Sequence, residues 1–207
     1  MLKAESRQVL ARIYGYGRGY VFTPKDFVDL ASPSNIRKIL TRLKKQGKIR
    51  RLARGIYEYP AYSKLLRAPA SPDPDAIARA FARAYGWKII ASGQTALNLL
   101  GLSTQVPAKW EYFSDGPAKI CKWSNGILVF KHRANRETTI LSYKTALLVQ
   151  ALKTLGEVNV SKTTIAILRN QFNLNERKRA LREARYATSW VYEVIKRLAS
   201  TAKVSNA

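Results

Sequence analysis

Nine lysine and arginine side chains fall in the eighteen positions from Arg37 to Arg54, and their type and spacing suit the binding of phosphate groups. No aspartate or glutamate occurs between Pro33 and Tyr57, so no carboxylate close in sequence neutralises these cations. Hydroxyl and amide side chains lie among them. The candidate binding residues are Ser34, Asn35, Arg37, Lys38, Thr41, Arg42, Lys44, Lys45, Lys48, Arg50, Arg51 and Arg54.

The spacing of the apolar residues predicts the elements that hold these cations. Ser32 can cap a helix, and Pro33 fits its first position, where a missing N–H costs nothing. Four apolar residues then recur at helical spacing and predict one buried face: Ile36, Ile39, Leu40 and Leu43. Gly47 ends this helix, and residues 48–59 predict a basic hairpin.

The residues upstream supply the front half of the same motif. Residues 6–14 predict a helix, and Tyr20–Phe22 predict a short strand. Thr23 caps a second helix whose Phe27 and Val28 are expected to face inward. Helix, strand, helix, tight turn, helix and hairpin is the order of a winged helix-turn-helix. In that motif the last helix enters the DNA major groove.

This placement predicts two roles for the candidate residues. Arginine and lysine can bond to guanine in the major groove, and Asn35 can bond to adenine. The residues expected to face the groove are Ser34, Asn35, Arg37, Lys38, Thr41 and Arg42. The residues expected to contact phosphates, which position a protein without reading sequence, are Lys44, Lys45, Lys48, Arg50, Arg51 and Arg54.

A glycine string connects the first helix to the first strand. Gly15, Gly17 and Gly19 are followed by no Lys-Ser/Thr pair, unlike a phosphate-binding loop, so we interpret the string as a flexible connection. Three tyrosines lie beside it: Tyr14, Tyr16 and Tyr20. Core packing is their default role, and contact with the DNA backbone is the open alternative.

The composition agrees with a polyanionic partner. The chain has 37 Lys and Arg against 13 Asp and Glu, a formal net charge of +24. Charge alone does not choose between DNA, RNA and an anionic membrane. No apolar run reaches the ~18 residues of a membrane span, and the N-terminus lacks the apolar segment of a secretory signal. We therefore expect a soluble, cytoplasmic protein with no membrane partner.

The sequence predicts two domains of α+β class joined by a proline-rich linker. The N-terminal domain is the winged helix-turn-helix, and the C-terminal one is an α/β domain with a small antiparallel sheet and C-terminal helices. The predicted divisions are residues 1–61 for the DNA-binding domain, 62–75 for the linker and 76–207 for the second domain.

In the second domain, Asp73 and Pro74 are the expected cap and first position of a helix. Asp115-Gly116 and Asn125-Gly126 suit tight turns and predict a small meander. The predicted strands are 87–91, 110–114, 118–123 and 127–132, with a short helix at 93–100. From Leu141 the chain is expected to be helical, including one helix over 181–198 with Tyr186, Trp190, Val194 and Leu198 on one stripe.

A second basic set lies in this helical part. Its members are Arg169, Arg177, Lys178, Arg179, Arg182 and Arg185. The sequence leaves two interpretations open, a solvated helix face or a second contact with nucleic acid.

Residues typical of catalysis are scarce. His132 is the only histidine and Cys121 the only cysteine, which excludes paired-His and Cys-His metal clusters. Cys121 is expected to be buried as a small hydrophobe. We therefore expect no catalytic residue, metal or cofactor, and no enzyme. Two alternatives stay open: an RNA-binding protein that uses the same basic surface, and a nucleic-acid-processing enzyme in which Glu111 and Asp115 hold a metal.

Three segments carry a family resemblance. Ser92–Lys109 reads SGQTALNLLGLSTQVPAK, and Tyr112–Pro117 reads YFSDGP. Together with the basic N-terminal part, they resemble the AbiEi antitoxins of bacterial and archaeal type IV toxin–antitoxin (abortive-infection) systems, in the subgroup with a short N-terminal winged helix. The run LGLSTQVP at Leu100–Pro107 is the most specific part. The similarity covers about residues 5–133, and beyond them only the helical character agrees.

The resemblance implies a transcriptional repressor that binds inverted repeats in the promoter of its own operon. Its partners would be this double-stranded operator DNA and, functionally, a nucleotidyltransferase toxin. The C-terminal domain of the family is needed to counter the toxin, without a tight complex between the two proteins. Only the winged-helix residues given above are carried over as a binding site.

Overall fold

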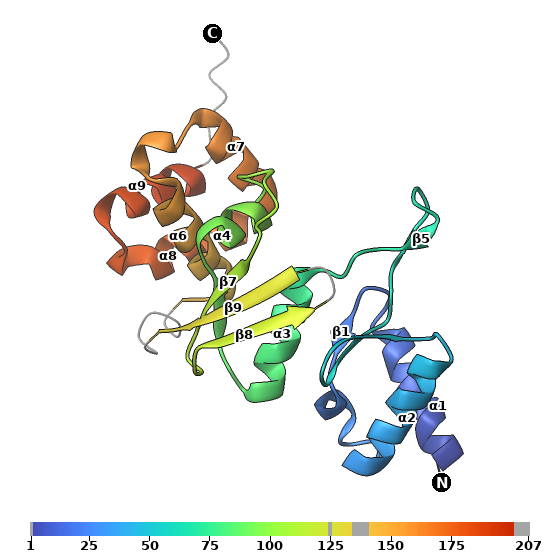
Figure 1. Ribbon diagram of the computed structural model, residues 1–207. Helices are drawn as coiled ribbons and strands as arrows, with labels where there is room; N and C mark the ends of the chain where they lie inside the picture. Colours follow the sequence, from blue (N-terminus) through green and yellow to red (C-terminus); the bar gives the residue numbers. More distant parts are fainter. Residues whose placement is uncertain (1, 124–125, 134–140, 201–207) are drawn as a thin grey trace. The chain divides into compact units, whose positions relative to one another are not determined.

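The computed structural model describes residues 2–123, 126–133 and 141–200, and it is an α+β structure (Figure 1). Its internal contacts divide the chain into two units. The N-terminal unit comprises Met1–Trp87 and Ile120–Leu128, and the C-terminal unit comprises Lys88–Lys119 and Val129–Ala207. The linker predicted at residues 62–75 stays a prediction, because this division keeps the helix after it with the N-terminal elements.

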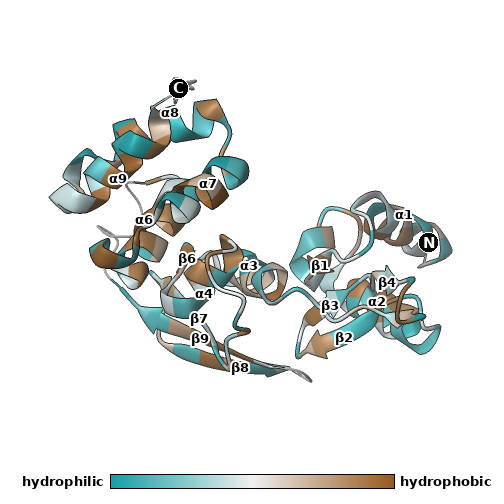
Figure 2. Cartoon of the chain, turned by 90° about the horizontal axis from the view of Figure 1, so that it is seen from above, coloured by the Kyte–Doolittle hydropathy of each residue, from teal (hydrophilic) through white to brown (hydrophobic). Residues whose placement is uncertain are grey.

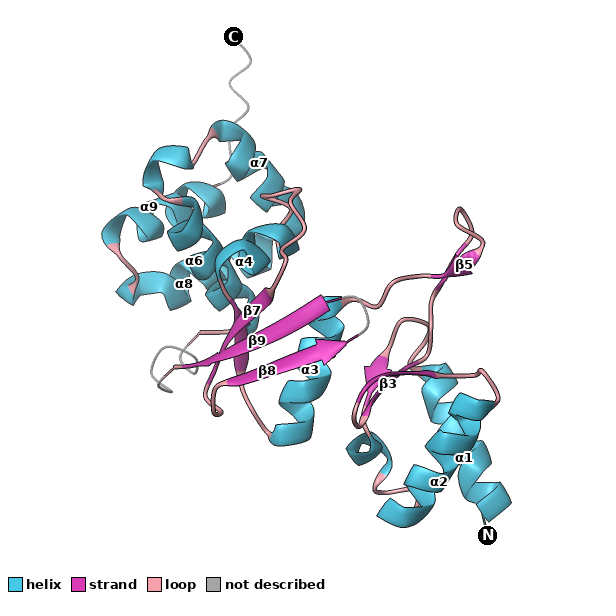
Figure 3. Ribbon diagram, in the orientation of Figure 1, coloured by secondary structure: helices cyan, strands magenta, loops and turns pink. Residues whose placement is uncertain are grey.

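The N-terminal unit begins with helices and short strands that alternate along the chain (Figure 3). In chain order these elements are α1 (Leu2–Gly15), β1 (Val21–Phe22), η1 (Pro24–Phe27), α2 (Pro33–Lys45), β2 (Arg50–Ala53), β3 (Ile56–Glu58), β4 (Tyr62–Ser63), β5 (Ala68–Pro69) and α3 (Pro74–Tyr85).

The core of this unit forms where α1 and α2 pack over β1 and η1. Val9 and Ile13 of α1 are fully buried against Phe22 and Phe27, whose rings meet edge to face with centroids 5.5 Å apart. The four apolar residues of α2 complete the cluster and are all buried, which confirms the predicted inner face: Ile36, Ile39, Leu40 and Leu43.

The two ends of α2 follow local chemistry. The Ser32 hydroxyl accepts a hydrogen bond from the Asn35 N–H at 3.3 Å, so Ser32 is the predicted cap. Gly47 follows the helix with a φ of +69°, a conformation that side chains with a Cβ rarely adopt. The turn that starts the hairpin therefore depends on glycine.

The segment before α2 differs from the prediction in one respect. Pro24–Phe27 form a single 3₁₀ turn where a second helix was predicted, and Val28 is 60% exposed instead of buried. At the start of this short turn, the Asp26 carboxylate accepts the Thr23 N–H at 2.7 Å, which satisfies that group without a longer helix.

The N-terminal sheet has the strand order β1-β3-β2, with both pairs antiparallel. In the hairpin, Arg50 lies opposite Glu58 at one end and Ala53 lies opposite Ile56 at the other. Glu58 is only 1% exposed, and its carboxylate accepts a hydrogen bond from Arg50 Nε. A buried carboxylate needs such a partner, so this ion pair belongs to the hairpin's core.

Helix α3 is bonded to the elements that begin the chain. The Asp73 side chain caps it, and Pro74 occupies its first turn, as predicted. Arg83 donates to the Val21 carbonyl at 2.8 Å, and Lys25 Nζ donates to the Ala84 carbonyl at 2.5 Å. These bonds account for the grouping of α3 with β1 and η1.

The remaining elements form a sheet and a group of helices. In chain order they are β6 (Ile89–Ala91), α4 (Gly93–Leu99), β7 (Trp110–Ser114), β8 (Lys119–Trp123), β9 (Gly126–His132), α6 (Tyr143–Leu155), η2 (Glu157–Asn159), α7 (Lys162–Gln171), α8 (Leu174–Glu183), η3 (Ala184–Tyr186) and α9 (Ser189–Ala199).

The strands of this sheet lie in the order β6-β7-β9-β8, and β6 pairs antiparallel with β7. The predicted meander is therefore wrong, because β9 lies between β7 and β8. A strand inside a sheet pairs on both edges. Strand β9 suits that position because it has seven residues and buries Leu128 and Phe130. Cys121 on β8 is buried, as predicted. The predicted turn at Asn125-Gly126 lies partly outside the described residues.

In the C-terminal unit α6 packs against α4 and α8, and α7 packs against α9. The predicted single helix over 181–198 is wrong: α8 ends at Glu183, and α9 begins at Ser189. Figure 2 shows α9 carrying both hydrophobic and hydrophilic residues, and its buried residues are Val191, Val194, Ile195 and Leu198. Tyr186 lies in the connection and is 94% exposed.

Glu183 ties the end of α8 to the start of α6. Its carboxylate accepts hydrogen bonds from the Ser142 hydroxyl at 2.7 Å and from Arg179 Nε at 2.6 Å. Burial raises the pKa of Glu183, but hydrogen bonds from Thr145, Arg179 and Ser142 outweigh burial and lower this pKa to about 2. The ionised carboxylate therefore holds two helices of this unit together.

Among the residues that the structure describes, no helix has the length and apolar content needed to cross a bilayer.

Candidate nucleic-acid interface

The outer face of α2 carries the cations that the sequence singled out. A shallow hollow of about 430 Å³ runs along this face, and it is lined by Arg37, Lys38, Thr41, Arg42 and Lys45. All five side chains are exposed, whereas the opposite face of the helix is buried. A helix with a packed inner face fixes the backbone positions from which these side chains project.

The cations on this face have no carboxylate partner in the part of the chain that the structure describes. Within residues 2–123, 126–133 and 141–200, no ion pair or side-chain hydrogen bond to an acidic group involves Arg37, Lys38, Arg42, Lys44, Lys45, Lys48, Arg51 or Arg54. Elsewhere in the N-terminal unit, arginine side chains form ion pairs with aspartate. Arg12 binds Asp29 at 2.6 Å, and Arg79 binds Asp75 at 2.6 Å. On α2 and the hairpin, only Arg50 forms an ion pair within the described residues.

The hairpin extends the basic surface in two directions. Arg54 lies in its turn beside Gly55, whose φ is +75°, and both Arg51 and Arg54 are exposed. Lys48 is also exposed, but it precedes β2 and so lies at the end of the hairpin away from the turn. Arg51 Nε donates to the Ala53 carbonyl at 3.2 Å, which leaves its other N–H groups free to bind.

Two candidate residues bond to acidic side chains that the sequence did not reveal as their partners. Asn35 is half-buried, and its amide donates to Glu5 of α1 at 3.1 Å. Arg50 donates to Glu58 and, through Nη2, to the Ala70 carbonyl at 2.6 Å. These two side chains hold the unit together, so we leave them out of the proposed interface. Ser34 is exposed at the start of α2 and stays in it.

The signals for these two partners were weak in the sequence. Glu58 is the first acid after a long basic stretch, but only the strand register places it opposite Arg50. Glu5 lies 30 positions before Asn35, and nothing in the periodicity of α1 favours that contact. Contacts of this range depend on how the elements pack.

In the second basic set, some side chains form hydrogen bonds within the protein and others are exposed. Arg169 donates to the carbonyls of Arg197 and Ser200 at 3.1 Å each, and so satisfies the end of α9. Arg177 donates to the Leu198 carbonyl, and Arg179 pairs with Glu183. The three exposed members without a partner in the described part of the chain are Lys178, Arg182 and Arg185.

The carboxylates of the enzyme alternative have other partners. Glu111 binds Lys131 Nζ at 2.7 Å, and Asp115 accepts the Lys88 N–H at 2.8 Å. His132 Nδ1 lies 2.9 Å from the Gly116 carbonyl. In the residues that could be described, no group of three or more acidic, histidine or cysteine side chains is arranged to hold a metal ion.

The segment that carries the family resemblance is a braced loop. It spans α4 and the chain after it, where Asn98 Nδ2 donates to the carbonyls of Ser103 and Gln105 at 3.4 and 3.1 Å. Thr95 is fully buried and accepts the Glu111 N–H at 2.8 Å. The Leu100–Pro107 run is thus held at two of its carbonyls by Asn98 of α4.

The fold and this surface define an α+β protein whose N-terminal unit presents an uncompensated basic helix and hairpin. Residues 8–180 match DUF6088, a family of unknown function, and the chain belongs to that family. No curated protein matches the chain. Among solved structures, the crystal structure of the RV2827C protein from Mycobacterium tuberculosis resembles 95% of this chain and 76% of that chain, at 15% sequence identity and a TM-score of 0.45.

Proposed function

We propose that this protein is a DNA-binding transcriptional repressor that acts as the antitoxin of a type IV toxin–antitoxin system. The N-terminal unit serves as a winged helix-turn-helix: α2 enters the major groove, and the hairpin contacts phosphates beside it. The operator is an inverted repeat in the promoter of the protein's own operon, and the protein acts in the cytoplasm.

One observation carries the DNA-binding part of this proposal. Apart from Arg50, the cations of α2 and the hairpin are exposed and form no ion pair within the described residues, although carboxylates elsewhere in the same unit pair with arginine. Uncompensated cations at i and i+4, such as Lys38 and Arg42, repel one another and destabilise a helix slightly. A polyanion that binds along this face relieves the repulsion, which supports nucleic acid as the partner.

The side chains divide by position. Arg37, Lys38 and Arg42 line the hollow on α2 and are the candidates for base contacts, with the Thr41 and Ser34 hydroxyls beside them. Five cations at the helix end and on the hairpin are the candidates for phosphate contacts: Lys44, Lys45, Lys48, Arg51 and Arg54. Five such contacts give a salt slope of roughly −4.5 in log K against log salt.

The antitoxin part rests on the resemblance of Ser92–Lys109 and Tyr112–Pro117 to AbiEi antitoxins. In this proposal the C-terminal unit counters a nucleotidyltransferase toxin encoded in the same operon, without forming a tight complex with it. The braced Leu100–Pro107 loop is the part of that unit in which the resemblance is most specific.

The DNA-binding part is tested by titrating the purified full chain onto the DNA immediately upstream of its gene. Shuffled DNA of equal length and composition is the reference, and each titration is repeated at several salt concentrations. We expect a preference of about 10³-fold or more for the upstream DNA, with the slope given above. A steep slope without preference overturns operator recognition, and tighter binding of a structured RNA at matched salt favours the RNA alternative.

Single substitutions separate the two kinds of contact. Arg37→Ala should relax the preference at one base-pair position, whereas Lys45→Gln should weaken binding to every sequence alike and reduce the slope by about 0.9. Lys153→Gln on α6 removes the same charge from an exposed site outside the interface and is the matched control. Equal losses on upstream and shuffled DNA for Arg37→Ala and Lys45→Gln would contradict this division.

The antitoxin part has its own test. The chain is expressed from a foreign promoter together with the nucleotidyltransferase encoded beside its gene, and growth is recorded. We expect growth to be restored both by the wild type and by a Lys38→Gln/Arg42→Gln variant that no longer binds the operator. Failure of the wild type to restore growth overturns the antitoxin role and leaves the DNA-binding proposal standing.

A further inference from the structure

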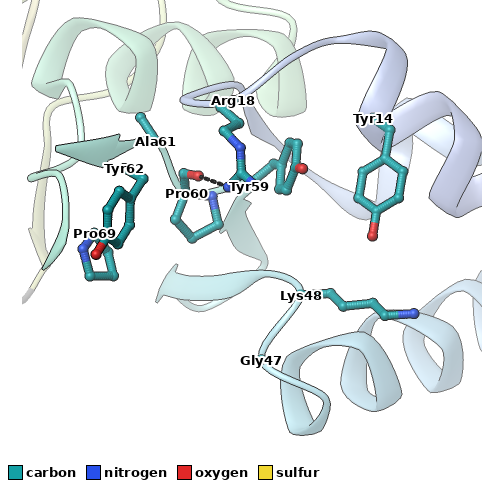
Figure 4. Close-up of a pocket in the computed structure, with 9 residues that line it drawn as sticks. All are labelled: Tyr14, Arg18, Gly47, Lys48, Tyr59, Pro60, Ala61, Tyr62 and Pro69. Atoms are coloured by element: carbon teal, nitrogen blue, oxygen red, sulfur yellow. Dashed lines mark hydrogen bonds between the residues drawn. The ribbon is translucent and has the colours of Figure 1, made fainter. Parts of the chain in front are cut away.

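The N-terminal unit has a hollow of about 300 Å³ beside the turn that follows α2 (Figure 4). Four segments of the chain line it: the end of α1 with the connection after it, the turn at Gly47, the chain that leaves β3, and Pro69 of β5. The lining side chains that matter for binding are Tyr14, Arg18, Lys48, Tyr59 and Tyr62. Pockets that hold small ligands begin at about this volume.

Backbone hydrogen bonds fix the walls of this hollow. The Gly19 N–H donates to the Tyr59 carbonyl at 2.6 Å, and the Tyr59 N–H donates to the Tyr20 carbonyl at 3.1 Å. Gly19 has a φ of +85°, so the glycine string provides a defined turn here. Arg18 Nη1 donates to the Pro60 carbonyl at 3.1 Å, as Figure 4 shows. The site is thus preformed, which lowers the entropy lost on binding.

The charged groups of the hollow suit an anion. Its lining includes Arg18 and Lys48 and no carboxylate. The Arg18 guanidinium lies over the Tyr59 ring, 4.8 Å from the centroid, and uses one N–H on Pro60. Its remaining N–H groups can bind a phosphate through paired hydrogen bonds, and the ammonium of Lys48 adds a second cation.

The uncharged groups suit a flat ring. Tyr14 and Tyr62 are 44% and 55% exposed, so part of each aromatic side chain is uncovered at the rim. The Tyr14 ring already packs against Tyr59, with centroids 5.0 Å apart. Exposed tyrosine rings beside arginine form a typical platform for stacking a nucleobase.

We propose that this hollow binds a nucleoside monophosphate, with the base stacked on the tyrosines of the rim and the phosphate bound by Arg18 and Lys48. The site does not depend on the proposed DNA-binding function. It shares only Lys48 with the proposed DNA surface, and Lys48 lies at the end of the hairpin away from the Arg54 turn.

The test is calorimetric titration of the full chain with adenosine 5′-monophosphate in moderate salt, compared with adenosine and with inorganic phosphate. We expect one site per chain and at least tenfold weaker binding of adenosine and of phosphate, because each keeps only one half of the contacts. Absence of binding overturns the proposal. Phosphate binding as tightly as the nucleotide also overturns it, since that result reflects the net charge of the chain alone.

Two variants locate the site. Arg18→Gln should weaken the nucleotide at least tenfold, whereas Lys153→Gln, which removes a charge elsewhere, should leave it unchanged. Tyr14→Leu/Tyr62→Leu keeps apolar bulk but removes both rings and should cost about fivefold or more, with Tyr186→Leu as the control for loss of an exposed tyrosine. Circular dichroism checks folding, and folded variants that bind like the wild type would refute the assignment.

Discussion

Replacing Arg50 by methionine should destabilise the N-terminal unit rather than weaken DNA binding directly. Glu58 is 1% exposed, and its salt bridge to Arg50 is the one that compensates its buried carboxylate. Methionine keeps most of the apolar stem but leaves that carboxylate without a countercharge. Removal of one partner from a buried pair costs ~3–5 kcal/mol. Because the Arg50 side chain is 29% exposed, water reaches part of the site, and we expect the lower figure, about 3 kcal/mol.

The reverse substitution should cost much less. Glu58→Gln leaves Arg50 in contact with solvent and with the Ala70 carbonyl, at 2.6 Å, so no charge is buried without a partner. Loss of one hydrogen bond to a charged group suggests about 1–2 kcal/mol. The double variant Arg50→Met/Glu58→Gln removes both charges and should be more stable than Arg50→Met alone.

Urea unfolding of the four proteins at pH 7 provides the comparison, and hydrogen exchange of residues 48–60 locates the change in the hairpin. The reasoning is refuted if Arg50→Met is no more destabilising than Glu58→Gln, or if the double variant shows no coupling. A DNA titration at a temperature where all variants are folded adds a second check. There, Arg50→Met should keep the wild-type salt slope, whereas Arg51→Met should reduce it by about 0.9.

Three further predictions concern stability. Ile39→Ala should lower the free energy of unfolding by ~2–5 kcal/mol in urea, because Ile39 is fully buried in the α1–α2 core. Gly47→Ala should cost about 1 kcal/mol through its φ of +69°, whereas Gly15→Ala, with no positive φ and open space at the Cβ, should cost nothing. The pKa of Glu183 is about 2, below its ordinary value of 4.5, so its contribution is present above pH 4.5 and is lost as the pH falls toward 2. Glu183→Gln should therefore make the melting temperature depend less on pH between 4.5 and 2. An unchanged dependence would contradict the assignment.

The sequence predicted the elements whose signals are local. Helix α2 has a cap, a proline at its first position and four apolar residues at helical spacing, and all of these point to the same boundaries. Strand β7 and the start of α3 were predicted for similar reasons. The outward face of α2 follows from the same periodicity, so the exposed cations of the candidate site could be found without the structure.

The wrong predictions have two causes. A helical spacing can continue in the sequence where the helix itself is interrupted, and turn residues do not determine which strands pair. The four-residue spacing from Tyr186 to Leu198 continues across the gap between α8 and α9, although Tyr186 is 94% exposed. The residue pairs Asp115-Gly116 and Asn125-Gly126 indicate where one strand ends and the next begins. They do not indicate the order of the strands in the sheet, in which β9 lies between β7 and β8. The partners of Asn35 and Arg50 could not be predicted for the same reason, because they come from α1 and from the strand register.

The distribution of carboxylates gives the basic face of α2 its significance. In the N-terminal unit Asp26, Asp29, Glu58 and Asp75 each form an ion pair with an arginine outside α2: Arg83, Arg12, Arg50 and Arg79. If the basic charge served only solubility, acids could be expected to neutralise part of α2 as well. Instead, the helix keeps mutually repelling cations on one face, which costs some stability. Because a bound polyanion removes that repulsion, the proposed operator DNA should raise the melting temperature of the N-terminal unit by an amount that its dissociation constant and concentration determine, and this rise should shrink as added salt weakens binding.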